Sequence, residues 1–134
     1  NINLSSGVAP VSRFLDNGLK VGLATDVAGG SHESILRAMM HAIQASKLRW
    51  RLYDQEVKPL PFERAFYLAT MGGGAFFGNV GSFLEGYEFD AVVLDDASLD
   101  HPQELSVRAR LERLVYLADE RCVREKYVAG EKVL

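Results

Sequence analysis

The stretch Lys20-Val21-Gly22-Leu23-Ala24-Thr25-Asp26 is the most informative part of this sequence about its fold. Bulky and small side chains alternate along it, and a short apolar run of this kind, closed by a turn, is typical of a buried strand. The small residues allow a helix or a neighbouring layer to approach closely. We therefore predict a β-strand over residues 20–25 that ends at an acidic residue.

Helices are predicted on both sides of this strand. The first covers residues 8–15 and ends before Gly18, and the second begins after a turn, with Ser31 as its cap. A third covers residues 62–69 and stops at Gly72-Gly73-Gly74. We interpret this triple glycine as a helix end that permits close packing, because it lacks the Gly-Lys-Ser/Thr ending of a phosphate loop. The order helix, strand, acidic residue, glycine turn, helix indicates an α/β protein.

The second half of the chain has a different pattern. Ala91-Val92-Val93-Leu94 predicts a buried strand, residues 106–119 a helix, and the C-terminus two short strands around a tight turn at Ala129-Gly130. No basic groove accompanies the aromatic residues between these elements, so we predict that they form core rather than a base-stacking surface. They are Phe76, Phe77, Phe83, Tyr87 and Phe89.

Composition restricts the possible partners. The chain has 134 residues, 48% of them hydrophobic and 25% charged, with a net charge of −3. This is globular composition, and it offers neither nucleic acid nor an anionic membrane a cluster of basic residues. The single cysteine, Cys122, cannot form an internal disulfide, which favours a reducing, cytoplasmic setting. A small molecule or another protein is the expected partner.

The count of strands predicts that this chain is a piece of a longer protein. A (β/α) barrel takes about 250 residues, and only the strand at 20–25 has the character of a parallel strand, which needs partners on both sides. One such unit exposes a large apolar face, and such a face favours association. A non-catalytic module that folds by forming a homo-oligomer is therefore the alternative to a fragment of an enzyme.

Asp26 is the strongest candidate for chemistry. It follows the predicted strand, and barrel enzymes place their catalytic groups at the C-terminal ends of strands. An aspartate that merely begins a turn is the alternative. His32 follows the glycine turn and could reach the same end of the strand, whereas His41 shares a helix face with polar residues and is predicted to be solvated. These residues make no complete metal site, since zinc takes at least three protein ligands.

Several motifs resemble the amidohydrolase superfamily, in the form found in guanine deaminases. The most specific are Asp26-Val27-Ala28-Gly29-Gly30, Phe66-Tyr67-Leu68-Ala69-Thr70 and Gly74-Ala75-Phe76-Phe77-Gly78, and residues 34–38, 42–47, 80–83, 86–93, 110–117 and 127–130 continue the match. The resemblance implies an α/β fold that is the C-terminal part of a metal-dependent hydrolase TIM barrel. Residues 1–78 would form the last βα unit and the following helices, and residues 79–134 would return into the small β-sandwich domain. Asn1 would come just after the seventh strand.

The resemblance also implies a reaction. The family's enzymes convert guanine and water to xanthine and ammonia with a zinc or iron ion. Asp26 would be both a metal ligand and the catalytic residue that moves protons, and His32 would lie on the substrate side. A sister enzyme, such as a triazine chlorohydrolase or another nucleobase deaminase, is the alternative.

The family's other functional residues have no counterpart in this chain. Its metal-binding histidines and its glutamate proton shuttle lie upstream of such a segment. We therefore expect the chain to bind no metal stably and to be inactive without its partner, the N-terminal part of the barrel.

Overall fold

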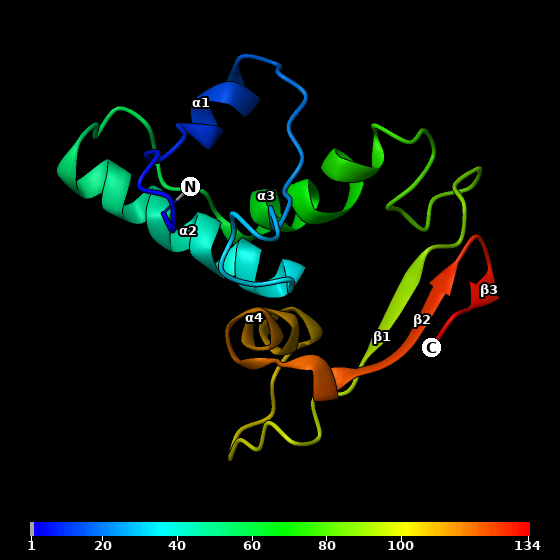
Figure 1. The fold of residues 1–134 in the computed structure, drawn as a ribbon. Coiled ribbons are helices and arrows are strands. Elements are labelled where there is room, and N and C mark those ends of the chain that lie inside the picture. The colour runs from blue at the N-terminus through cyan, green and yellow to red at the C-terminus, as the bar shows by residue number, and fades with distance from the viewer. Residues whose placement is uncertain (1) are drawn as a thin grey trace.

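The computed structural model describes residues 2–134, which form a group of helices with a small sheet at one side (Figure 1). Asn1, with its predicted place after the seventh strand, lies outside the described residues. The helices α1, α2 and α3 come first in the chain, and the three strands β1, β2 and β3 belong to its second half. The elements are α1 Val11–Asp16, α2 Ile35–Leu52, α3 Phe62–Tyr67 continued by the π-helical turn η1 Leu68–Gly72, β1 Ala91–Leu94, α4 Val107–Leu117, the 3-10 turn η2 Glu120–Cys122, β2 Val123–Val128 and β3 Glu131–Lys132.

The long helix α2 begins at a different cap from the one predicted. Ser34, not Ser31, precedes its first residue, and the Ser34 hydroxyl accepts a hydrogen bond from the backbone N–H of Arg37. Both serines suit the role, but Ser34 directly precedes the apolar stripe of the helix, so its side chain reaches the free N–H groups of the first turn. Arg49 and Arg51 lie in the last turn, where a positive charge interacts favourably with the negative end of the helix dipole.

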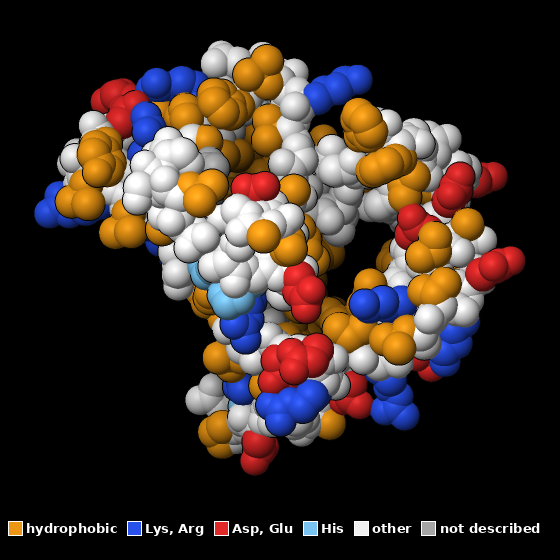
Figure 2. Space-filling view, viewed as in Figure 1, with side chains coloured by type: hydrophobic (Ala, Val, Ile, Leu, Met, Phe, Trp, Pro, Cys, Tyr) orange, Lys and Arg blue, Asp and Glu red, His pale blue; other side chains and the backbone are white. Residues whose placement is uncertain are grey.

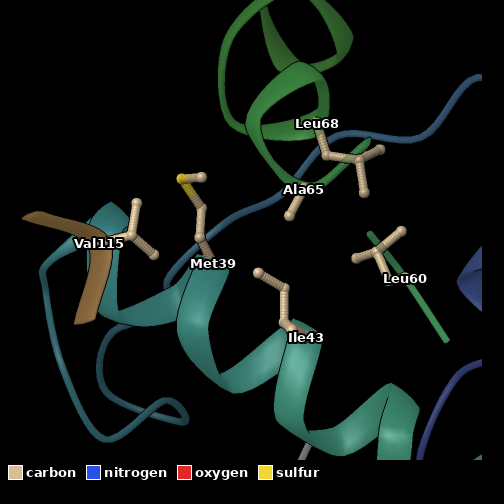
Figure 3. Packing of buried hydrophobic residues seen from close by; sticks show 6 residues of the cluster. All are labelled: Met39, Ile43, Leu60, Ala65, Leu68 and Val115. Carbon is tan, nitrogen blue, oxygen red and sulfur yellow. The ribbon is translucent and has the colours of Figure 1, made fainter. Parts of the chain in front are cut away.

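One apolar core joins α2, the α3–η1 segment and α4 (Figure 3). Its members come from both halves of the chain, because Val115 of α4 packs against residues of the helices that precede it. They are Met39, Ile43, Leu60, Ala65, Leu68 and Val115. A smaller cluster of Leu114, Ala118 and Cys122 connects α4 to the end of β1. The predicted boundary between residues 1–78 and 79–134 stays a prediction.

The sheet is antiparallel, with the order β1-β2-β3. Ala91 pairs with Tyr127, and β2 and β3 form the predicted terminal hairpin. Its turn residues, Ala129 and Gly130, both have positive φ angles, which a tight hairpin turn requires. The prediction of a buried strand at β1 was wrong, since Val92 and Val93 of this strand are 55% and 40% exposed.

Within residues 2–134, the predicted strand over residues 20–25 is not part of any sheet. Its side chains alternate between half-buried and exposed, as a strand requires, and Val21 and Leu23 pack against the core. Its neighbour is helical, however: the N–H of Leu23 donates to the carbonyl oxygen of Leu68 at 2.9 Å. The predicted close approach is confirmed, because a Cβ atom on Gly22 would lie 2.9 Å from the Cα of Gly73.

The predicted aromatic core was also wrong. Phe76, Phe77 and Phe83 are at least 77% exposed and Phe89 is 51% exposed, and apolar side chains are spread over the face shown in Figure 2. The rings contact one another: Phe89 lies 5.8 Å from Phe83 and 5.6 Å from Tyr127, between ring centroids. None of the helices within residues 2–134 is long and apolar enough to cross a membrane.

Candidate functional site

Asp26 lies at the end of the segment that packs on η1, in a sharply turned backbone. Its φ angle is +52°, a left-handed conformation that aspartate tolerates better than most residues. The N–H of Gly30 donates to its carbonyl oxygen. A Cβ atom on Gly29 would lie 2.7 Å from Asp26 Oδ2, and one on Gly30 would collide with the carbonyl oxygen of Thr25. The two glycines therefore let the turn fold back beside the carboxylate.

Residues 2–9 cover one side of this turn. The Asn3 side chain donates from Nδ2 to the carbonyl oxygen of Gly29 at 2.9 Å, and Arg49 Nη1 donates to the carbonyl oxygen of Val8 at 2.9 Å. These two hydrogen bonds connect the N-terminal segment to the glycine turn and to the far end of α2. The segment thus forms a wall opposite the helix.

A cavity of about 250 Å³ lies between this wall, the Asp26 turn and α2. Its polar lining includes Asp26, His32 and His41, and most of the remaining lining is small or apolar. Sites for small molecules usually occupy roughly 300–1,000 Å³. The cavity is thus slightly smaller than that range, which is the size expected for a part of a binding site.

The two histidines form a group with an arginine. Their rings lie 5.5 Å apart between centroids, and Arg37 Nη1 lies 3.5 Å from His32 Nδ1. On the face shown in Figure 2, histidine side chains lie directly beside a basic one. The prediction that His41 is solvated was wrong, because it is half-buried and lines the cavity. Ala45 lies one turn further along the same face of α2 and is only 7% exposed. An alanine at this position was the available sequence signal that another part of the chain covers this face of the helix.

The described residues do not make a metal site by themselves. No group of three or more histidine, cysteine or acidic side chains within residues 2–134 is placed to hold a metal ion. The Asp26 carboxylate is free of hydrogen bonds and ion pairs from this part of the chain. It can therefore contribute one oxygen ligand to a site whose other ligands come from elsewhere, but it cannot build a zinc site alone.

A second, larger cavity of about 430 Å³ lies far from Asp26 in sequence, in the loop between β1 and α4. The two main charged residues that line it, Arg110 and Asp96, are paired with each other, because Arg110 donates two hydrogen bonds of 2.7 Å to the Asp96 carboxylate. These hydrogen bonds hold the pKa of Asp96 below its usual value. The pair is therefore structural, and the smaller cavity at Asp26 is the better candidate site.

The sequence profile of the amidohydrolase family matches residues 1–133. The chain belongs to the amidohydrolase family. This membership confirms the resemblance seen in the motifs and implies that the chain is part of a TIM-barrel hydrolase. The predicted roles of Asp26 and His32 stay predictions.

Known guanine deaminases are similar to this chain over its whole length. The crystal structure of guanine deaminase from C. acetobutylicum, described with bound guanine in the active site, has 42% sequence identity and a TM-score of 0.93 and covers 100% of this chain and 32% of its own. Guanine deaminase of Dictyostelium discoideum is 33% identical over 99% of this chain and 31% of its own length. The human guanine deaminase is 34% identical over 100% of this chain and 32% of its own length. The chain thus spans about a third of these relatives.

Proposed function

We propose that the protein to which this chain belongs is a guanine deaminase, which hydrolyses guanine to xanthine and ammonia. The observation that carries the proposal is the similarity to guanine deaminases along the entire chain, together with a partner-free Asp26 carboxylate at a small cavity. We further infer that residues 20–52 correspond to the last βα unit of the barrel, and that the sheet β1-β2-β3 is part of a small β-sandwich domain. The cytoplasmic setting belongs to the same proposal.

Asp26 is the residue of this chain that acts in the proposed reaction. Water adds to the carbon that carries the amino group, and the C–N bond then breaks to release ammonia. A carboxylate beside the attacking water accepts its proton and returns it to the departing nitrogen, which balances the reaction. A zinc or iron ion, held mainly by residues outside this chain, would lower the pKa of that water.

The rest of the cavity suits the substrate side. His32 lines the same space as Asp26, and a histidine ring can donate a hydrogen bond to an acceptor atom of a purine. We place His32 on the substrate side for this reason. The small residues of the wall and of α2 leave room for a flat ring.

We propose that the 134 residues are inactive without the remaining part of the barrel, because the described residues supply one metal ligand where at least three are needed. Apolar side chains are exposed in both halves of the chain, and such surfaces favour association with the rest of the barrel or with a second copy of the protein.

The experiment is an assay of guanine turnover with two proteins, the 134-residue chain and the complete polypeptide that contains it. We expect xanthine and ammonia in equal amounts from the complete polypeptide and none from the chain. Turnover by the chain alone would contradict the claim that its site is incomplete. Activity of the complete polypeptide on a different heterocycle, with none on guanine, would move the proposal to a sister deaminase or chlorohydrolase.

A further inference from the structure

The contact between Arg37 and His32 favours one of the two positions for the proton of the neutral histidine ring. A guanidinium group can only donate hydrogen bonds. Arg37 Nη1 faces His32 Nδ1 at 3.5 Å, and this contact is a hydrogen bond only when Nδ1 offers its lone pair as the acceptor. The proton of the neutral ring is then on Nε2, so His32 presents Nε2–H as a donor.

The start of α2 fixes the backbone of Arg37, and a carboxylate lies within reach of its charge. Its N–H is bound by the Ser34 hydroxyl at the start of α2, and its side chain is part-buried rather than free in solvent. The pKa of Asp119, which follows α4, is lowered mainly by hydrogen bonds from Arg121, and the charge of Arg37 contributes as well. Arg37 therefore lies within the electrostatic reach of a fixed carboxylate.

The His41 ring is a second neighbour of the His32 ring. The two rings lie 5.5 Å apart and are tilted by 41°, and both line the cavity that Asp26 also lines. The His32 ring therefore has two neighbours that limit its orientation, the His41 ring and the Arg37 guanidinium. Its remaining nitrogen, Nε2, is the one free to contact a ligand.

We propose that Arg37 is a positioning residue, which fixes His32 in the Nε2–H form so that this group donates a hydrogen bond to an acceptor atom of a heterocycle in the Asp26 cavity. The ligand class is a flat ring with a ring nitrogen or a carbonyl oxygen. The inference rests on the proposed function in one respect: the KM values below are measured by guanine turnover. Arg37 does not line the cavity itself, so its effect on a ligand passes through His32.

Two replacements of His32 give opposite results for the two tautomers. A glutamine side-chain amide reaches about as far as Nε2, whereas the shorter asparagine amide reaches about as far as Nδ1. In the complete polypeptide we expect the KM for guanine of His32→Asn to exceed that of His32→Gln by up to about tenfold, the usual value of one hydrogen bond. The kcat values should differ much less. A KM for His32→Asn equal to or below that of His32→Gln would overturn the proposal.

Replacement of Arg37 tests the positioning role. Arg37→Met removes the donor and keeps much of the side-chain length, so we expect KM to rise while kcat changes little, and Arg37→Lys to restore part of the loss. Arg51→Met, at an exposed position in the last turn of the same helix, is the matched control and should leave both parameters unchanged. A normal KM in Arg37→Met would contradict the role of Arg37.

A measurement without turnover separates this proposal from the proposed function. In protein labelled with ¹⁵N-histidine at pH 8, where ordinary imidazoles are neutral, the His32 signal is the one missing from His32→Gln. We expect a non-protonated Nδ1 and a protonated Nε2 in the parent, and both tautomers in Arg37→Met. This result without guanine turnover would reject only the proposed function. A protonated Nδ1 in the parent would reject the inference even in an active deaminase.

Discussion

Replacing Gly72 by alanine tests whether the Asp26 segment is held by direct backbone contact with the π-helical turn η1. A Cβ atom at Gly72 would lie 2.6 Å from the carbonyl oxygen of Val21. Ordinary van der Waals contact begins at 3.4 Å, so the two backbones would have to separate by about 0.8 Å. Neither partner is a flexible side chain that could turn away.

The cost in stability can be isolated with the neighbouring glycine as control. Overpacking of this kind costs about 1–3 kcal/mol, while alanine in place of a helical glycine contributes up to about 1 kcal/mol in the opposite direction. A Cβ atom on Gly73 would lie 3.5 Å from its nearest neighbour, the carbonyl oxygen of Leu68, and meets no conflict. Because both variants gain the same helix propensity, the difference between Gly72→Ala and Gly73→Ala should be about 1–3 kcal/mol.

The same shift should reach the chemistry, because the displaced segment ends at Asp26. A misplacement of about 1 Å can reduce catalysis by about 10²-fold. In the complete polypeptide we expect a loss of this order in kcat/KM for Gly72→Ala and little loss for Gly73→Ala. Urea unfolding followed by circular dichroism measures the stability, and guanine turnover measures the activity. Equal stability and equal activity of the two variants would contradict the claim that close backbone contact with η1 holds the Asp26 segment in place.

Three further variants test other contacts. Leu68→Ala removes a side chain that is 1% exposed and should cost about 2–5 kcal/mol in urea unfolding; a cost below about 1 kcal/mol would argue against the core described above. Arg49→Met removes the hydrogen bond to the carbonyl oxygen of Val8, so limited proteolysis should cut within residues 2–9 sooner than in the parent, and an unchanged cleavage rate would count against this anchor. Arg110 lowers the pKa of Asp96 in the folded protein, so the pair stabilises the fold above the unfolded pKa, and this contribution disappears as the pH falls below about 4. Unfolding measured against pH should show a shallower acid loss in Asp96→Asn, and an identical slope would contradict the pairing.

Sequence patterns were sufficient to predict the elements whose formation depends on residues close by in the chain. The helix at residues 107–117 and the hairpin turn at Ala129 follow from helical spacing and turn chemistry, and both are present. The position of Asp26 at the end of an alternating segment also follows from the local pattern. These features need no knowledge of what packs against them.

Features that depend on distant contacts could not be predicted in this way. Residues 20–25 have the pattern of a strand, but a strand needs a partner, and the segment lies instead against η1. His41 looked solvated because the wall that covers its helix face comes from residues 2–9. The aromatic residues, such as Phe76, are apolar by composition, but their burial depends on a surface that residues 2–134 do not supply.

The central claim is that Asp26 is the catalytic residue that this chain contributes to a metal-dependent guanine deaminase. The most direct measurement compares the complete polypeptide with its Asp26→Asn variant, in guanine turnover and in metal bound per protein. We expect the variant to fold normally, because no described residue bonds to the carboxylate, to bind less metal, and to lose about 10²–10⁴-fold in kcat. Guanine turnover by Asp26→Asn within a few-fold of the parent, at unchanged metal content, would contradict the claim.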